Sequence, residues 1–154
     1  MIIRKAEEQD YAAVDQIILN LHALHVASNP DFYEPIDHVI TMADYQEFIA
    51  SPEHLYYVAE EDGLICGIVF ATTKDINAPD MIKQKTGYMD SLYVLPAYRR
   101  KGIGKQLFLF IEEKLALHGV QHLNLMVWQF NQGAAKFYEK LGMTAQRAIY
   151  WKEL

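Results

Sequence analysis

Apolar residues recur every three or four positions in several stretches of the chain, and this spacing predicts helices. The first of these stretches begins at the acidic residues Glu7 and Glu8 and ends at Asn29-Pro30, signals that favour the start and the end of a helix. Gly119 and Gly142 close two later stretches in the same way. Four helices are expected, over residues 7–29, 41–50, 102–118 and 131–141.

Alternating or continuous apolar runs between turn residues predict the strands. The expected strands are Ile2–Ile3, His54–Glu60, Leu64–Thr73, Gly87–Leu95, Leu123–Trp128 and Ala148–Trp151. Asp62-Gly63 favours a hairpin, and the polar stretch Asp75–Lys85 is expected to be a loop. The order of elements predicts an α/β fold, a mixed sheet with helices packed over it.

Length and composition favour one domain over residues 1–154. The 154 residues are 51% apolar and 22% charged, which excludes a disordered chain and suffices for a core. No apolar run reaches the length of a membrane span, and a charge at Arg4 comes too early for a signal peptide. We therefore expect a cytoplasmic protein without a membrane partner, in which the single cysteine, Cys66, is a buried structural thiol.

Charge is distributed unevenly along the chain. The net charge of −6 argues against a nucleic-acid partner. Residues 1–73 carry 13 acidic side chains and only two basic ones, Arg4 and Lys5, whereas residues 74–154 carry 12 basic and 7 acidic side chains. If both halves line one cleft, the second half suits an anionic ligand and the first a cationic one. A solvated acidic face is the alternative.

A basic, glycine-spaced turn follows the strand that ends at Leu95. Its glycines allow close approach of the backbone to a ligand, and the following helix start offers N–H groups to an anion. Arg99 and Gln106 stand where a Walker loop needs glycine and serine or threonine, and Leu107 replaces the last glycine of a dinucleotide fingerprint. Two interpretations of this turn remain: a phosphate-binding turn of another kind, or the plain start of a helix.

The turn resembles the acetyl-CoA pyrophosphate loop of the GNAT acetyltransferase superfamily, in the form Arg99-x-x-Gly102-x-Gly104 behind Leu-Tyr-Val-x-Pro. The later segment Asn131-x-x-Ala-x-x-Phe-Tyr-x-x-Leu-Gly-Met resembles the same family, so the resemblance covers nearly the whole chain. It implies a mostly antiparallel sheet splayed between its fourth and fifth strands, acetyl-CoA as co-substrate and no metal. The residues implied to bind acetyl-CoA are Leu92, Tyr93, Val94, Arg99, Arg100, Lys101, Gly102, Ile103, Gly104, Lys105, Asn131, Ala134, Phe137 and Tyr138.

Acetyl transfer to an amine requires a group that takes a proton and one that gives a proton to the departing thiolate. The resemblance implies that Tyr138 is the thiolate acid. Some relatives carry a glutamate on the fourth strand where Tyr88 stands here. Asp90, on the same strand face if no bulge intervenes, is our candidate base, directly or through water. Asp90 could instead bind the cationic acceptor or cap the sheet, or water alone could relay the proton.

Other polar and aromatic side chains offer weaker candidates. His22 and His25 lie one helical turn apart and could line the cleft or relay a proton, but a metal site needs further ligands. His38 and His54 have no assigned role. Six aromatic residues would line the acceptor side in the family architecture, although about half of them belong to the core by burial tendency. They are Phe32, Tyr33, Tyr45, Phe48, Tyr56 and Tyr57.

The resemblance therefore predicts an enzyme that moves an acetyl group from acetyl-CoA to a primary amine by direct attack. The acidic first half favours a small cationic acceptor, such as a polyamine or an aminoglycoside-like amine. The alternatives are a protein or peptide N-acetyltransferase and an acetyl-CoA sensor without turnover. Family members are often dimers, so a homodimer is expected as one arrangement; the aromatic strand Ala148–Trp151 could pair with a second copy, or serve core packing.

Overall fold

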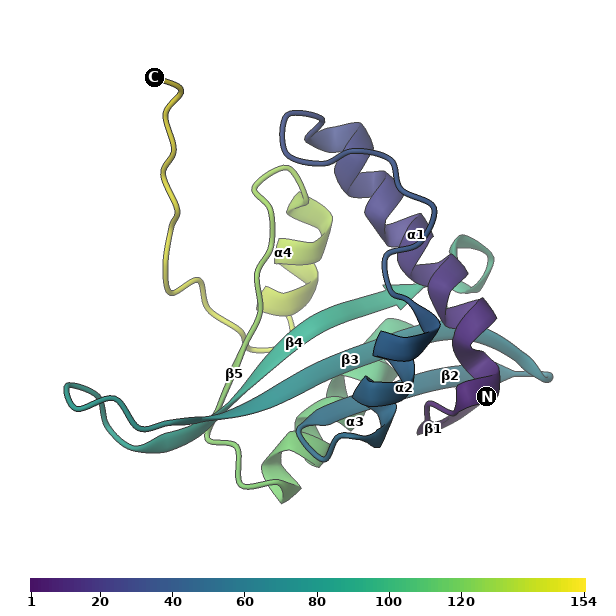
Figure 1. Cartoon of the computed structure of the whole chain (residues 1–154), viewed down its shortest axis with the longest axis horizontal. Coiled ribbons are helices and arrows are strands. Elements are labelled where there is room, and N and C mark those ends of the chain that lie inside the picture. The colour runs from purple at the N-terminus through teal and green to yellow at the C-terminus, as the bar shows by residue number, and fades with distance from the viewer.

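Five strands form one sheet in the order β1-β2-β3-β4-β5 in a computed structural model that describes residues 1–154 (Figure 1). The first four strands pair antiparallel, and β5 pairs parallel to β4. The strands are β1 (Ile2–Lys5), β2 (His54–Glu61), β3 (Leu64–Ile76), β4 (Gln84–Val94) and β5 (His122–Asn124). The α/β fold class predicted from the sequence is confirmed.

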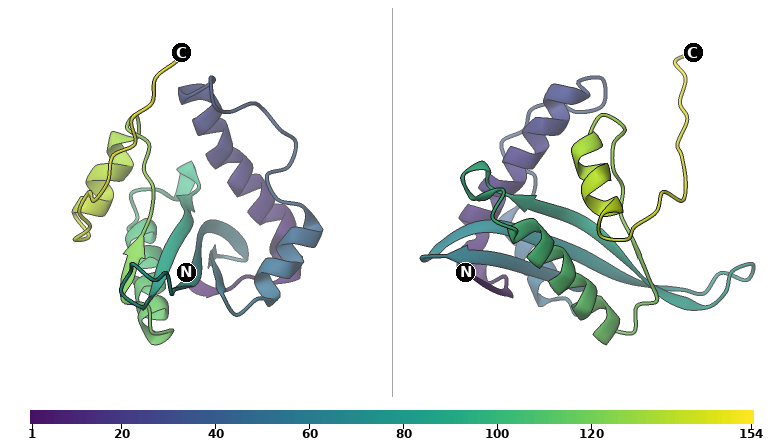
Figure 2. Two further views of the ribbon diagram at one scale, coloured as in Figure 1. Left: turned by 60° about the vertical axis from the view of Figure 1, so that its left-hand side comes forward. Right: turned by 180° about the vertical axis from the view of Figure 1, so that it is seen from behind.

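Four α-helices cover the two faces of the sheet, as the two views of Figure 2 show. They are α1 (Tyr11–Ser28), α2 (Met42–Ala50), α3 (Ile103–Leu117) and α4 (Gln132–Glu139). Short 3-10 turns, Glu8–Asp10 and Pro96–Tyr98, precede α1 and follow β4. None of the helices is both long and apolar enough to cross a membrane.

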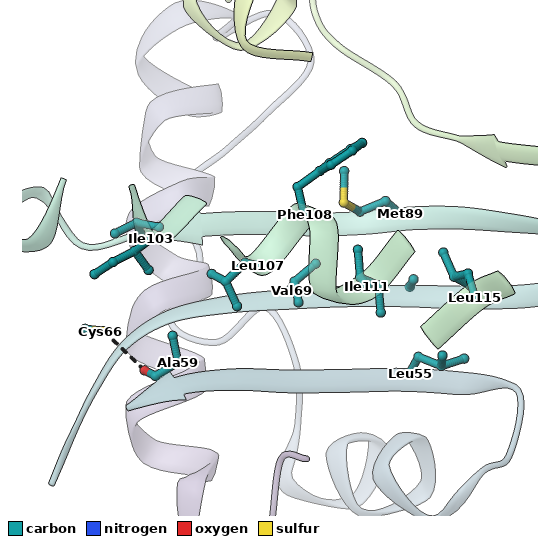
Figure 3. Packing of buried hydrophobic residues seen from close by; sticks show 12 residues of the cluster. Leu55, Ala59, Cys66, Val69, Met89, Ile103, Leu107, Phe108, Ile111 and Leu115 are labelled. Carbon is teal, nitrogen blue, oxygen red and sulfur yellow. Dashed lines mark hydrogen bonds between the residues drawn. The ribbon is translucent and has the colours of Figure 1, made fainter. Parts of the chain in front are cut away.

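The strand alternation divides the core into two clusters. Helix α3 packs Leu107, Ile111 and Leu115 on residues such as Val69 of the strands beneath it (Figure 3). Helices α1 and α2 cover the other face, where Val14 and Tyr45 are fully buried. Successive residues of β4 therefore face opposite helices, because side chains alternate along a strand.

A β-bulge interrupts the pairing of β3 with β4. Phe70 pairs with Ser91 and Ala71 pairs with Met89, so Asp90 is an extra residue on β4 without a partner on β3. Bulges re-aim side chains and are common next to functional sites. Tyr88 and Asp90 nevertheless share the face covered by α1 and α2, because both line one cavity with Thr72 of β3.

The sheet is splayed between β4 and β5. These strands pair at only three positions, from Thr86 with His122 to Tyr88 with Asn124. Beyond Tyr88, β4 continues to Val94 with its β5-side edge unpaired, while the chain after Asn124 turns away toward α4 (Figure 1). Parallel strands that separate in this way leave backbone N–H and C=O groups free to bind an extended ligand.

Two strand predictions are corrected by the structure. The strand predicted for Leu123–Trp128 is limited to His122–Asn124, because the splay removes its partner after Asn124. The strand predicted for Ala148–Trp151 does not form, because this segment meets no sheet edge of its own chain and runs away from the sheet (Figure 2). The other predicted elements form, with shifts at their ends, and β3 and β4 reach into the loop expected at Asp75–Lys85.

The buried position of Cys66 is confirmed. Its thiol is fully buried and donates a hydrogen bond of 3.3 Å to the carbonyl of Ala59 (Figure 3). Burial raises the pKa of the Cys66 thiol, so the reactive thiolate is disfavoured.

Candidate active site

The turn between β4 and α3 presents a row of unused backbone donors. No N–H group from Arg100 to Lys105 donates to a protein carbonyl, because the first bond of the helix runs from Gln106 N–H to Gly102. Gly102 has φ 82° and Arg100 has φ 66°, left-handed conformations that turn the backbone here. Unused N–H groups at the start of a helix, together with the helix dipole, are suited to bind an anion.

The basic side chains of this turn divide into two groups. Arg99 bends back along the sheet, where its Nε donates to the Val94 carbonyl at 2.9 Å and its guanidinium lies over the Tyr93 ring. Lys101 lies 3.5 Å from a carboxylate oxygen of Glu61. Arg100 and Lys105 are exposed and have no ion pair in the chain, so they are the basic groups free to meet a phosphate.

Helix α4 forms the second wall beside this turn. A Cβ built on Gly104 would lie 3.6 Å from the Phe137 ring and 3.9 Å from Leu92, so β4, α3 and α4 meet at this glycine. Asn131 caps α4, and its side-chain oxygen accepts a hydrogen bond of 3.1 Å from the Ala134 N–H. The amide nitrogen of Asn131 has no protein acceptor and remains available to a ligand.

The remaining residues expected to bind acetyl-CoA are placed by the strand alternation. Leu92 and Val94 pack toward α3, whereas Tyr93 packs toward α1, so a ligand in the splay meets their backbone rather than their side chains. Ile103 is buried in the core beneath the turn and offers only its N–H.

Tyr138 points from α4 toward α3. Its ring packs 5.9 Å from that of Phe108 and 5.2 Å from that of Phe137, measured between centroids. The side chain is half-buried, and its hydroxyl has no hydrogen-bond partner in the chain. Burial raises the pKa of Tyr138 to about 12, so the phenol stays protonated at neutral pH and can act only as a proton donor.

Asp90 lies on the opposite face of the splay from α3. Its Oδ2 accepts a hydrogen bond of 2.8 Å from the Thr72 hydroxyl. Surrounding protein raises the pKa of the Asp90 carboxyl through desolvation, although the Thr72 hydrogen bond and nearby His54 act in the opposite direction. The carboxyl is still open to solvent on one side, so it can exchange protons with a ligand or water.

His54 lies across the sheet from Asp90, on the far side of Thr72. His54 on β2 pairs with Thr72 on β3, which in turn pairs with Tyr88 on β4. The imidazole stacks on Tyr56 at 5.6 Å, and its Nδ1 is buried without a hydrogen-bond partner. Neither Thr72 nor His54 was assigned a role from the sequence, because only the strand register brings them beside Asp90.

An aromatic bridge joins the end of α1 to the segment after β5. His25 stacks on Tyr33 at 5.1 Å, and the indole N–H of Trp128 donates to the Tyr33 hydroxyl at 3.0 Å. The Nε2–H of His22 donates a hydrogen bond of 2.8 Å to the Glu34 carbonyl oxygen. Burial, and then the charge of His22, lowers the pKa of His25, which favours the neutral imidazole. Both histidine rings pack against Tyr33, and no group of three metal-ligating side chains exists in the chain.

The six aromatic residues expected on the acceptor side separate into different environments. Tyr45 and Tyr56 are buried core residues, and Phe48 packs beside them. Tyr57 is corrected: it faces α3 and packs against Phe110, because it alternates with Tyr56 on β2. Phe32 and Tyr33 contact Trp128 and so lie at the aromatic bridge.

The family model described as acetyltransferase (GNAT) family matches residues 20–143. The chain belongs to this family. The family predicted from the sequence is thereby confirmed. The match includes the β4–α3 turn and all of α4.

Three similar proteins illustrate the range of the GNAT family. An N-alpha-acetyltransferase of Sulfurisphaera tokodaii is 30% identical over 155 residues, 96% of this chain and 82% of that protein. An L-ornithine N5-acetyltransferase of Arabidopsis thaliana is 28% identical over 123 residues, 77% of this chain and 50% of that protein. The crystal structure of a mutant of the BH1408 protein from Bacillus halodurans superposes with a TM-score of 0.95 at 28% identity, covering 100% of this chain and 99% of that one.

The chain is shorter than some of these relatives. It spans about half the length of the plant enzyme and of an N-acetyltransferase from Lactobacillus delbrueckii subsp. lactis. The similarity to these two proteins therefore concerns the acetyltransferase part that they share with this chain.

Proposed function

We propose that this GNAT protein transfers the acetyl group of acetyl-CoA to a small cationic primary amine by direct attack. One observation carries the proposal. The splay between β4 and β5 separates an anion-binding turn and a protonated phenol, on the α3 side, from a carboxyl of raised pKa on the α1 side. A thioester that enters from one side and an amine from the other would meet in the splay.

The cofactor side would bind and orient acetyl-CoA. Acetyl-CoA supplies the acetyl group as a thioester. The N–H groups of residues 100–105 would hold its pyrophosphate, with Arg100 and Lys105 beside them. The unpaired edge of Leu92–Val94 would pair with the pantetheine arm, and the free amide of Asn131 would contact it from α4. The Tyr138 hydroxyl would donate a proton to the departing thiolate.

The acceptor side removes a proton. A primary amine arrives as an ammonium ion, because its ordinary pKa is about 10. Asp90 is the candidate base: it would attract the ammonium, and its raised pKa brings it closer to a useful basicity than an exposed aspartate. In the alternative, the same carboxyl of Asp90 binds the ammonium and a water molecule takes the proton.

Two further observations favour a cationic acceptor. Helices α1 and α2, which cover the face of the sheet that carries Asp90, belong to the first half of the chain, which has no lysine or arginine from Ala6 to Thr73. One relative is named as an acetyltransferase of L-ornithine, a small cationic amine. Another is named as an N-alpha-acetyltransferase, so peptide N-termini are the second candidate acceptors.

The test is thiol release from acetyl-CoA by the purified protein with polyamines, aminoglycosides, amino acids and peptides as acceptors. Release confined to small cations supports the proposal, and release with peptides alone favours the second candidate. Tight acetyl-CoA binding without any release contradicts an enzyme and favours a sensor.

The variant Tyr138→Phe identifies the thiolate acid. We expect kcat to fall by about 10²-fold or more, while the Kd for CoA stays within about twofold, because the hydroxyl acts only on the departing thiolate. Tyr57→Phe is the matched control, since Tyr57 is a half-buried phenol that packs against Phe110 on the same face. An unchanged kcat in Tyr138→Phe would remove Tyr138 from the mechanism.

A further inference from the structure

A polar cavity of about 390 Å³ opens beside Asp90, where β5 leaves β4. Its lining contains one negative and one positive side chain, Asp90 and Lys74. The full lining is Thr72, Lys74, Thr86, Gly87, Tyr88, Asp90 and Asn124. The positive charge of Lys74 would not attract an acceptor that carries only positive charges.

The strand register fixes how the two charges are separated. Thr72, which holds Asp90 by a hydrogen bond, and Lys74 are two residues apart on β3 and so share one face. Two residues of a strand span about 6.6 Å. Lys74 therefore lies one step along β3 from the residue that holds Asp90, and both charged residues line the same cavity.

The ammonium group of Lys74 forms no ion pair with another side chain of the protein. The ion pairs of the chain involve Arg4, His38 and Lys101, and Lys74 forms none. Lys74 is also the first basic residue of the chain after Lys5. An unpaired ammonium in a concave polar site is suited to bind a carboxylate.

Two neutral donors lie near this ammonium. Tyr88 lines the cavity, is 42% exposed, and forms no side-chain hydrogen bond within the protein. Asn124 pairs with Tyr88 across β4 and β5 and brings a side-chain amide to the same wall. Lys74, Tyr88 and Asn124 together provide the donors that the oxygens of one carboxylate require.

We propose that this cavity binds the carboxylate of the acceptor, so that the acceptor is a diamino acid acetylated on its side-chain amine. The assignment rests on the proposed function. The α-amine of an amino acid is bound to the same carbon as its carboxylate and stays near Lys74. Only an amine at the other end of the molecule reaches Asp90.

A diamine without a carboxylate fits this cavity less well. Its second ammonium would lie near Lys74, and like charges at this separation repel. L-Ornithine and putrescine differ only by the carboxylate, and so do L-lysine and cadaverine. These two pairs isolate the contribution of the carboxylate.

The experiment measures kcat/KM for both pairs with wild-type protein and the variants Lys74→Gln and Lys74→Glu. We expect wild type to prefer each diamino acid, Lys74→Gln to raise KM for the diamino acid about tenfold with little effect on the diamine, and Lys74→Glu to reverse the preference. Mass spectrometry should locate the acetyl group on the side-chain amine. Lys85→Gln is the control, because Lys85 lies outside the cavity on β4.

Two results would overturn the assignment: an equal or better kcat/KM for the diamines in wild type, or an equal loss for both substrates in Lys74→Gln. Calorimetric titration of the CoA-bound protein with ornithine separates this proposal from the proposed function. Lys74-dependent ornithine binding without turnover would support the cavity and contradict the enzyme mechanism. Absence of ornithine binding would overturn the cavity assignment, whatever the turnover with other amines.

Discussion

The two sides of the splay, the proposed cofactor side and the proposed acceptor side, are built in different ways. The cofactor side is formed mostly by backbone N–H groups from one contiguous stretch, Arg100–Lys105. The acceptor side is formed by side chains from separate segments, among them His25, Thr72, Asp90 and Trp128. Backbone donors depend on conformation, whereas side-chain groups depend on identity and on the register of strands.

This difference predicts how each side responds to substitution. On the cofactor side, a substitution weakens CoA binding when it alters the path of the backbone, whereas removing one side chain there has a small effect on the Kd for CoA. A change on the acceptor side acts when it removes a single chemical group. The two sides are therefore separable in experiment, by the Kd for CoA on one side and by KM, kcat and pH dependence on the other.

Asp90→Asn should have the largest effect, on the acceptor side only. We expect kcat/KM to fall by about 10²- to 10³-fold, with the Kd for CoA unchanged, because the amide cannot accept the ammonium proton. A base must be deprotonated to act, so the wild-type rate should fall as pH decreases through the pKa of Asp90, which lies above the ordinary aspartate value. The measurement is a pH profile of kcat/KM for both proteins.

The pH profile distinguishes the two roles of Asp90. If Asp90 is the base, the acidic limb disappears from the residual activity of Asp90→Asn. If the limb is retained and only KM rises, Asp90 binds the ammonium and water relays the proton. Asp75→Asn, on the hairpin outside the cavity, is the matched control and should behave as wild type.

Gly102→Ala should have an intermediate effect, on the cofactor side only. An L-residue at φ 82° costs about 1–2 kcal/mol, and relief of this strain would rotate the donors of the turn. We expect the Kd for CoA to rise about tenfold, while KM for the amine stays the same. Isothermal titration gives the Kd, and thermal unfolding gives the loss of stability.

Gly63→Ala provides the control for strain alone. Gly63 has φ 77° in the turn between β2 and β3, so alanine there carries a similar strain without touching the donors. Equal loss of stability with unchanged CoA binding is expected for this variant. If Gly102→Ala also left CoA binding unchanged, the turn would not be the pyrophosphate site.

The same contrast explains what could be predicted from the sequence. The helix over residues 102–118 and its glycine-rich start are encoded locally, and the structure forms this helix over Ile103–Leu117. Asp90 could be singled out because it lies on a recognisable strand near that motif. Thr72, His54 and Lys74 could not, because their position beside Asp90 depends on the pairing of β2, β3 and β4.

The two corrected strands have a related cause. The sequence Leu123–Trp128 is apolar enough for a strand, but strand formation needs a hydrogen-bonded neighbour, and β4 diverges after Tyr88. Ala148–Trp151 has the composition of a strand and no neighbouring edge in its own chain, so Ile149 and Tyr150 are exposed. Local pattern describes the propensity of a segment, whereas the sheet decides whether it has a partner.

The smallest effect is expected at the aromatic bridge, with Tyr33→Phe. This variant keeps the ring that stacks on His25 and removes the hydroxyl that accepts from the Trp128 indole, a loss of about 1 kcal/mol. We expect a two- to threefold rise in KM for the amine and no change in the Kd for CoA, because the bridge joins α1 to the segment before α4. Trp128 fluorescence and steady-state kinetics measure the two effects.

Acid pH tests the bridge independently. The pKa of His25 lies below the ordinary histidine value of about 6.5, so its contribution to stability is present above pH 6.5 and is lost as pH falls through the lowered pKa. Wild type and Tyr33→Phe should both show this loss, since both bury His25, whereas Tyr33→Ala should show less of it. Equal acid sensitivity in all three proteins would mean that Tyr33 does not shield His25, and that the bridge does not order the acceptor side.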